Sequence, residues 1–320
     1  MERQIVAFAM HRLPSFKISL EMKLVIKIKF IVWIAMIAFN TTSHSQVIKG
    51  KVIDSLTKNP VELANITFVK RDLGVHSDRG GMFKIKVKDL LDELQISSVG
   101  YNKKTISLLT FNESKDYTIE FELSPKTEIL GEVIISNKKK NYGSVKTFGL
   151  IKKLKVRSGF PFGYEFCNYI KNPTNKKGKI KSIILSLNEN TEADFLATYN
   201  LKFYEYDSVN KRPGEEIYFE NLIVEPQNKT YRLKIDIEPL KIKLPQSGIC
   251  VGVEIVNTKY DQEISSMAKI APRINFTHTK MEILTWTRFR SKKWAVGTHK
   301  SQVKDSFVNA MINIEVQLEK

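Results

Sequence analysis

The feature that most constrains this chain is a strict alternation of apolar and charged residues. Across residues 231–237 every odd position is apolar and every even position is charged. Successive side chains of a β-strand point to opposite faces, so this pattern predicts a strand with one buried and one solvated face. The same spacing recurs at residues 249–255 and 312–318, and no stretch after residue 160 has helical periodicity. The sequence therefore predicts a chain built from strands.

The carboxy-terminal half is long enough for a complete β-sandwich. About 160 residues with roughly eight such runs suit a two-sheet, jelly-roll-like sandwich. We expect this domain to occupy residues 160–320. The chain is 42% hydrophobic and 10% aromatic, which excludes wholesale disorder. The order of runs at 201–207 and 244–254 loosely resembles a jelly-roll domain common in exported bacterial proteins, and no function follows from that resemblance.

The amino terminus has the residue order of a secretory signal. An apolar run at residues 30–39 is followed by Ser43 and Ser45, small residues spaced as signal peptidase requires. The basic residues that precede the run are Lys23, Lys27 and Lys29. The run is about ten residues long, whereas a permanent membrane helix needs ~20. A lasting membrane anchor or a buried helix is the alternative interpretation.

We therefore expect residues 1–45 to be a signal peptide, helical before its removal, with residue 46 as the first of the mature chain. Met22 is a candidate initiator, because the residues before it precede the basic start awkwardly. The mature protein is then exported to the periplasm or the cell surface, with no permanent transmembrane helix.

Residues 46–125 predict a smaller β-sandwich. Short apolar runs separated by turn residues occur at 47–53, 64–69, 82–88, 94–101 and 117–123. In the third run Phe83, Ile85 and Val87 share one face, and the lysines between them face water. We expect the ring of Tyr101 to cap the core.

These residues resemble the carboxypeptidase regulatory-like domain, a small transthyretin-like sandwich. The matching pieces are residues 48–54, 60–66, 77–83 and 94–101, within a match over roughly residues 47–124. The resemblance implies an exported or cell-surface module. Such modules are often attached to envelope enzymes or to outer-membrane transporters of Bacteroidetes-type bacteria, and the domain carries no known catalytic residues. A transporter barrel would need far more chain than remains here.

The histidines do not support a zinc peptidase. Such a site needs two histidines and a glutamate on one metal, beginning with His-x-x-Glu. None of the five histidines opens that spacing; they are His11, His44, His76, His278 and His299. We predict no catalytic set, no metal and no cofactor.

A basic linker is predicted over residues 126–159. The whole chain carries 51 basic and 34 acidic residues, a net charge of +17. Much of the excess lies between residues 126 and 181, with fourteen basic and three acidic residues. Nucleic acid is the usual partner of such a stripe, but export disfavours it, and anionic envelope glycans or lipid head groups fit better. A lysine-rich solvated surface without a specific partner is the alternative.

The two cysteines leave two interpretations open. Cys167 and Cys250 both lie in strand-like runs of the second domain. An exported chain with an even number of cysteines permits one disulfide bond, but both could equally be small buried hydrophobic residues.

A candidate ligand surface lies near the end of the chain. Its members combine aromatic rings and cations that would suit an anionic sugar or peptide, namely Trp286, Arg288, Arg290 and Trp294. Tyr204, Tyr206 and Phe289 are further contacts of the same kind. The alternative is that the tryptophans lie in the core or at a sheet edge. Glu215 and Glu216 are neighbours on a strand and would diverge, so they make a poor acid pair.

The leading hypothesis is a non-enzymatic binding or scaffolding protein of the bacterial envelope that recognises a glycan or protein partner. The alternative is an uncharacterised glycan hydrolase or esterase with its site in the second domain. Two carboxylates converging in a cleft within ~5–10 Å would favour the hydrolase.

Overall fold

The computed structural model describes most of the chain, namely residues 27, 29, 46–87, 91–111, 117–126, 140–150, 156–157, 161–260, 269–280, 282–296 and 305–320. The chain divides into two compact units, Met1–His44 and Ser45–Lys320. In the first unit only Lys27 and Lys29 are described, and both are helical. The signal peptide predicted over residues 1–45 otherwise lies outside the described residues. Among the described residues, no helix has the length and apolar character needed to span a membrane.

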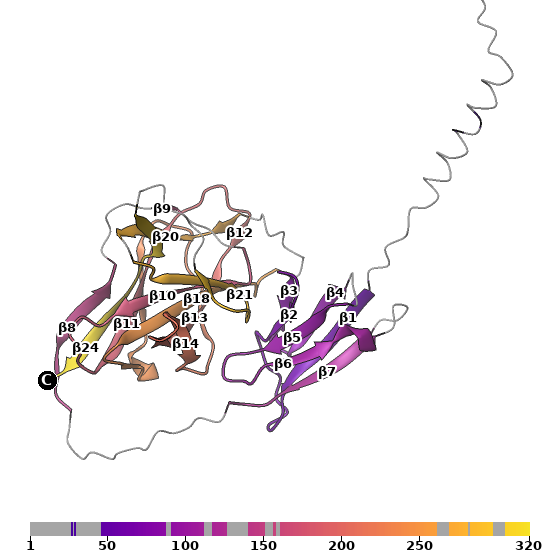
Figure 1. Cartoon of the computed structure of the whole chain (residues 1–320), viewed down its shortest axis with the longest axis horizontal. Coiled ribbons are helices and arrows are strands. Elements are labelled where there is room, and N and C mark those ends of the chain that lie inside the picture. The colour runs from indigo at the N-terminus through magenta and orange to yellow at the C-terminus, as the bar shows by residue number, and fades with distance from the viewer. Residues whose placement is uncertain are drawn as a thin grey trace, which may run out of the picture. The chain divides into compact units, whose positions relative to one another are not determined.

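Two small sheets form the first sandwich (Figure 1). One has the order β4-β1-β7, with β1 (Gln46–Asp54), β4 (Met82–Val87) and β7 (Tyr117–Leu123). The other has the order β3-β2-β5-β6, with β2 (Asn65–Phe68), β3 (Gly74–His76), β5 (Glu93–Ser97) and β6 (Lys104–Ser107). A 3-10 turn, η1 (Leu108–Thr110), follows β6.

The predicted alternation of β4 is confirmed. Phe83, Ile85 and Val87 are buried in the first core, and Met82, Lys84 and Lys86 are exposed. Tyr101 packs partly buried against the same core, and its hydroxyl donates a hydrogen bond to Asp54 at 2.9 Å.

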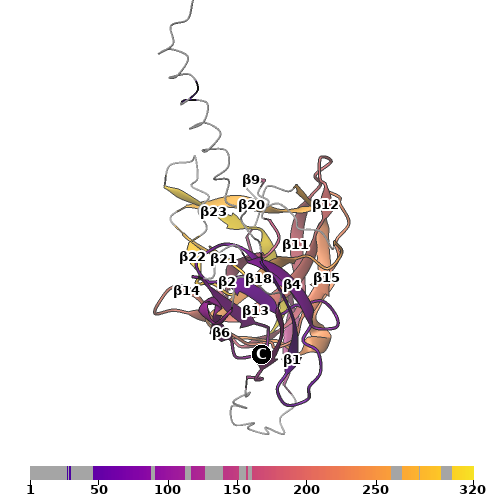
Figure 2. The ribbon, with the colours of Figure 1, turned by 90° about the vertical axis from the view of Figure 1, so that its right-hand side faces the viewer.

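The second sandwich also has two main sheets. The first has the order β14-β13-β18-β10-β21-β22, with β15 beside β13. Its strands are β10 (Tyr164–Lys171), β13 (Thr198–Asp207), β14 (Arg212–Glu216), β15 (Leu222–Val224), β18 (Gly248–Val256), β21 (Thr285–Phe289) and β22 (Ala295–Val296). β13 lies beside β18 in both ribbon views (Figures 1 and 2).

The facing sheet has the order β23-β20-β11-β24-β8, with β16 and β17 on β11 and β9 on β20. Its strands are β8 (Tyr142–Gly149), β9 (Val156–Arg157), β11 (Gly178–Asn188), β16 (Arg232–Asp236), β17 (Lys243–Leu244), β20 (Arg273–Lys280), β23 (Ser306–Ala310) and β24 (Ile312–Glu319). A short pair, β12 (Phe195–Leu196) with β19 (Ile270–Ala271), and the 3-10 turn η2 (Glu238–Leu240) complete the described elements. From β10 onward, the chain crosses repeatedly between the two sheets, and the all-β, jelly-roll-like fold predicted from the sequence is confirmed.

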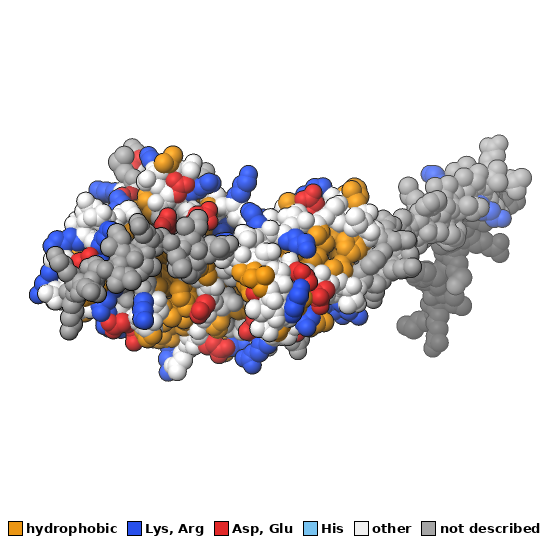
Figure 3. Space-filling view, turned by 90° about the horizontal axis from the view of Figure 1, so that it is seen from below, with side chains coloured by type: hydrophobic (Ala, Val, Ile, Leu, Met, Phe, Trp, Pro, Cys, Tyr) orange, Lys and Arg blue, Asp and Glu red, His pale blue; other side chains and the backbone are white. Residues whose placement is uncertain are grey.

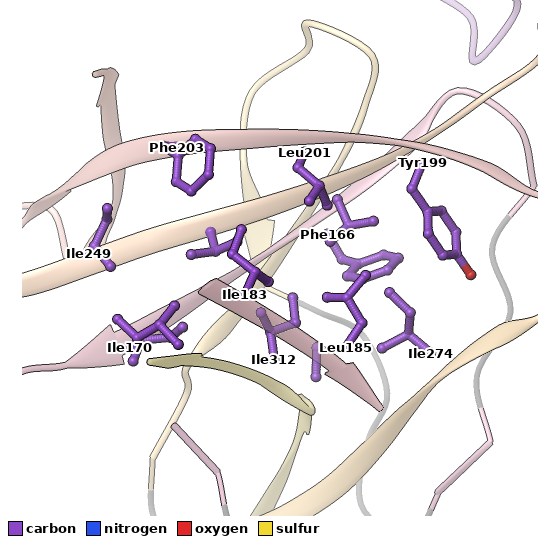
Figure 4. Close-up of a cluster of buried hydrophobic side chains, with 14 of the residues drawn as sticks. Phe166, Ile170, Ile183, Leu185, Tyr199, Leu201, Phe203, Ile249, Ile274 and Ile312 are labelled. Atoms are coloured by element: carbon purple, nitrogen blue, oxygen red, sulfur yellow. The ribbon is translucent and has the colours of Figure 1, made fainter. Parts of the chain in front are cut away.

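Apolar side chains from both sheets fill the space between them (Figure 4). Phe166 from β10 and Leu201 from β13 meet Ile183 and Leu185 from β11, and all four are buried. Complete burial of a side chain of this size contributes about 1.5–3 kcal/mol. The period-two apolar runs of the sequence therefore form the core of the second sandwich.

The second sandwich begins earlier than the predicted boundary at residue 160. β8 pairs with β24, and β9 pairs with β20, although both strands fall inside the predicted linker over residues 126–159. Phe148 is the only buried residue of β8, so this strand lacks the alternation of buried and exposed residues that is seen in the others. Backbone pairing with β24 holds it in place. Residues 127–139 of the predicted linker lie outside the described residues.

Candidate functional site

A row of charged side chains crosses the outer face of the β13-β18-β10-β21 sheet. Glu165 on β10 lies opposite Glu254 on β18 and opposite Arg288 on β21. Directly opposed residues of neighbouring strands project to the same side of a sheet. The neighbour of Glu165, Phe166, faces the core between the two sheets. Glu165, Glu254 and Arg288 therefore share the face that points away from that core.

The row is a closed network of ion pairs and hydrogen bonds. Arg288 Nε and Nη2 lie 2.9 and 2.8 Å from Glu165 Oε2. The Tyr204 hydroxyl donates to Glu165 Oε1 and accepts from Arg288 Nη2, both at 2.7 Å. Lys202 Nζ lies 2.8 Å from Glu254 Oε2 and 3.7 Å from Glu165 Oε2. Buried charges need such partners, because desolvation otherwise outweighs their attraction.

Gly252 makes room for this network. A Cβ at this position would lie 2.3 Å from Glu165 Oε1 and 2.9 Å from the ring of Tyr204. Glycine therefore lets the carboxylate and the phenol meet above β18.

Burial and ion pairing set the protonation states. Burial alone would raise the pKa of Glu254, but Lys202 and a hydrogen bond from His76 outweigh it and lower the pKa below its usual range. Burial alone would lower the pKa of Lys202, but Glu254 and Glu165 raise it. Glu254 and Lys202 are therefore both charged at neutral pH.

The first sandwich packs onto this row through His76 and Asn65. His76 Nε2 lies 3.5 Å from Glu254 Oε1, and since a carboxylate only accepts, the imidazole is the donor. Burial, followed by the charge of Arg290, lowers the pKa of His76 to about 4. His76 is therefore neutral at pH 7.

Arg290 lies on the second sandwich and connects it to the first through hydrogen bonds. Its Nη1 donates to Asn65 Oδ1 at 2.8 Å and to the Val75 carbonyl at 3.1 Å, and its Nη2 donates to the Gly74 carbonyl at 3.0 Å. Arg290 has a left-handed backbone at φ 52°, which is uncommon for a residue with a side chain. Further side-chain contacts between the sandwiches follow it at Ser291, to Gln95, and at Lys292, to Asp72.

Arg290 is a buried cation without an acidic partner. It is 4% exposed, and no Asp or Glu in the described part of the chain forms an ion pair with it. All three of its acceptors are neutral, and its Nε has no hydrogen-bond partner. Burial lowers its pKa to about 10, so it still carries its charge at neutral pH.

A cavity of about 310 Å³ opens beside the network, with walls from both sandwiches. Its two acidic residues, Glu215 and Glu216, come from β14. Its cationic residues are Lys103, Lys126, Lys202, Arg288 and Arg290. Lys126 Nζ pairs with Glu216 at 2.8 Å. No group of three or more His, Cys, Asp or Glu side chains suited to a metal occurs among the residues that the structure describes.

The structure brings three of the four predicted ligand-binding residues together. The guanidinium of Arg288 lies 4.1 Å from the centroid of the Trp294 ring, and both arginines line the cavity. Trp286 is 4% exposed and packs into a buried cluster with Tyr204, Leu284 and the two cysteines, and Trp294 packs against the same cluster. Trp286 therefore occupies the buried position that the sequence left open as an alternative. The role of these residues in ligand binding stays a prediction.

The other predicted contacts are placed differently. Tyr204 is buried in the network, Tyr206 stacks on Tyr169 with ring centroids 3.7 Å apart, and Phe289 is buried against Tyr164. These side chains form no second site.

Four residues of the buried network were not predicted from the sequence, namely Glu165, Lys202, Glu254 and His76. Lys202 lies inside the apolar run 199–204, and Glu254 lies inside the nine buried residues of β18. A lone charge in an otherwise apolar strand was the signal that could have revealed them, because such a charge needs a buried partner.

Cys167 and Cys250 lie close together as free thiols. They occupy neighbouring strands, with Cys167 opposite Gly252 and Cys250 opposite Tyr169, and both are buried. Burial, together with the adjacent Cys250, raises the pKa of Cys167. Their disulfide stays a prediction.

The surface does not gather its lysines into one patch on the face that Figure 3 shows. There Lys and Arg side chains are interspersed with Asp and Glu side chains. The excess of basic residues therefore identifies no interaction surface on this face, whereas five cationic residues line the cavity.

Comparison with known proteins identifies the first sandwich. Residues 48–135 match the family model for the CarboxypepD_reg-like domain. No curated protein matches the chain significantly. Among solved structures, a DUF3823 family protein from Parabacteroides merdae is 12% identical, with a TM-score of 0.19 over 67% of this chain and 100% of the other. One from Bacteroides uniformis is 9% identical, with a TM-score of 0.20 over 85% and 98%. The amino-terminal sandwich thus carries a CarboxypepD_reg-like domain, as its sequence predicted.

Proposed function

We propose that the protein is a non-enzymatic binding or scaffolding protein of the bacterial envelope that recognises a glycan or protein partner. The supporting observation is that both carboxylates of the buried network already have their hydrogen-bond and ion-pair partners within the protein. Glu165 accepts from Tyr204 and twice from Arg288, and Glu254 is held by Lys202 and His76. These groups hold two sandwiches together, and none of them faces the cavity as an unpaired acid, base or nucleophile.

Clusters of titratable residues with shifted pKa values often mark active sites, so the network is also compatible with the hydrolase alternative. Glu165 and Glu254 both contact the ammonium of Lys202, so their nearest oxygens are at most about 6.5 Å apart, which does not exceed the ~5–10 Å separation of the carboxylates in glycoside hydrolases. This observation is the one that favours a hydrolase.

The burial of both glutamates and the lowered pKa of Glu254 argue against a hydrolase. Glu165 and Glu254 are 0% and 1% exposed, so a substrate in the cavity would not reach them. A glycoside hydrolase also needs one carboxylic acid with a raised pKa, whereas the pKa of Glu254 is lowered. Binding without turnover is therefore the better account of this geometry.

Export to the periplasm or cell surface is part of the proposal. It is supported by the predicted signal at residues 1–45 and by the CarboxypepD_reg-like domain at 48–135. Cell fractionation with an antibody against the chain tests it, and recovery of the chain only from the cytosol would contradict it.

A paired assay tests the binding function. The full chain is immobilised for capture from envelope extract and on a glycan array, and it is also screened against chromogenic glycosides and esters. We expect retained ligand and no turnover. Turnover that Glu165→Gln or Glu254→Gln abolishes, in variants that keep the wild-type circular dichroism spectrum, would refute the proposal.

A further inference from the structure

The cavity and the network together carry one positive charge in excess. The cations are Lys103, Lys126, Lys202, Arg288 and Arg290, and the carboxylates are Glu165, Glu215, Glu216 and Glu254. His76 adds no charge, because its pKa is about 4. The unmatched cation inside the protein is Arg290, which has only neutral acceptors. A buried charge of this kind favours a monovalent anion nearby, since attraction is strong where water is scarce.

Hydrogen-bond donors for such an anion line the cavity. Arg288 uses Nε and Nη2 within the network, and its Nη1 has no partner in the part of the chain that the structure describes. The guanidinium is held by Glu165 and by the ring of Trp294. Lys103 is exposed and contributes an ammonium from the first sandwich. A fixed guanidinium with a free N–H edge is well suited to an oxyanion.

The walls favour a sugar over an apolar side chain. Val99 is the only aliphatic residue among the lining residues, whereas Ser97, Ser98 and Asn102 present hydroxyl and amide groups. A volume of about 310 Å³ is at the lower end of ligand pockets, ~300–1,000 Å³, and admits one sugar-sized unit.

We propose that this cavity binds the carboxylate-bearing unit of an acidic glycan, a uronic acid residue, with Arg288 Nη1 and Lys103 as its donors. The inference rests on the proposed binding function and specifies the ligand. The single negative charge of a uronate matches the single excess charge of the site, and its hydroxyls match the serine and asparagine wall.

Saturation-transfer NMR and isothermal titration calorimetry on the full chain test this inference with D-glucuronate, D-galacturonate and D-glucose. We expect binding of at least one uronate and none of glucose. Lys103→Glu reverses an exposed charge at the cavity and should weaken uronate binding about fivefold or more. Lys84→Glu is the matched control, because Lys84 is an exposed lysine on the other sheet of the same sandwich. Arg288→Lys is a second variant, used where circular dichroism shows that it folds.

Three results would overturn the inference. They are equal binding of glucose and uronates, no binding of either uronate, and uronate binding that Lys103→Glu leaves unchanged. If the paired assay captures a neutral glycan or a protein and neither uronate binds, the proposed ligand class is wrong, but the proposed binding function is still supported. Turnover of a substrate would instead refute the binding function.

Discussion

Replacing Glu165 by glutamine tests whether the buried network stabilises the protein. The substitution keeps the shape of the side chain and removes its charge. Glu165 is fully buried and serves both Arg288 and Lys202. In the variant, Lys202 keeps its ion pair with Glu254, whereas Arg288 loses its ion pair with residue 165.

The size of the expected loss in unfolding free energy depends on the ion pairs that remain in the variant. Removing one partner of a buried ion pair lowers the free energy of unfolding by about 3–5 kcal/mol. Lys202 keeps its 2.8 Å contact with Glu254, so we expect a value near the lower end, about 3 kcal/mol. That is a large share of the roughly 5–15 kcal/mol by which a typical domain is stable.

Urea unfolding followed by tryptophan fluorescence measures the loss. Of the three tryptophans, Trp286 and Trp294 lie beside the network in the second sandwich. Glu205→Gln is the matched control, because Glu205 is an exposed glutamate on β13 and should change stability by no more than about 0.5 kcal/mol. A loss for Glu165→Gln below about 1 kcal/mol, with Glu205→Gln unchanged, would show that the network does not stabilise the fold.

Four further tests concern the same region and the two cores. The pKa of His76 is lowered from 6.5 to about 4, so the protein should lose up to about 3 kcal/mol of stability as the pH falls from about 6.5 to 4. The urea concentration at the unfolding midpoint should fall less steeply with decreasing pH in His76→Gln than in the wild-type protein. Equal slopes for the two proteins would contradict the lowered pKa of His76. Gly252→Ala should destabilise by at least about 1–3 kcal/mol, because its Cβ would overlap Glu165 Oε1, and a wild-type melting curve would contradict this. Tyr101→Phe should lose about 1 kcal/mol with its hydrogen bond to Asp54, measured by urea unfolding, and an unchanged midpoint would assign that bond no net contribution. Alkylation with and without reductant, read by mass spectrometry, decides whether Cys167 and Cys250 are bridged in the purified protein, which the sequence leaves open.

The strands with strong apolar alternation could be predicted from the sequence. In β4, β18 and β24 the apolar positions recur every second residue, and these positions are the ones that the two cores bury. β8 could not be predicted in this way, because Phe148 is its one fully buried side chain. Its position depends on pairing with β24, which is far away in the sequence.

The candidate site was only partly predictable for a related reason. Arg288, Arg290 and Trp294 stood out as cations beside aromatic rings near the end of the chain. Both arginines line the cavity, and the ring of Trp294 lies against the guanidinium of Arg288. Their partners Glu165, Glu254 and His76 come from three other strands. Only the pairing of β10 with β18 and β21, and the packing of the first sandwich, bring them to one place.

Scanning calorimetry of the full chain tests the central claim most directly, namely that the buried polar network makes two sandwiches one cooperative unit. The account predicts a single unfolding transition for the wild-type protein over residues 46–320. Arg290→Ala removes the donors to Asn65, Gly74 and Val75, and should separate the unfolding of the two sandwiches into two transitions. Two independent transitions in the wild-type protein, or a single unchanged transition in Arg290→Ala, would contradict the account.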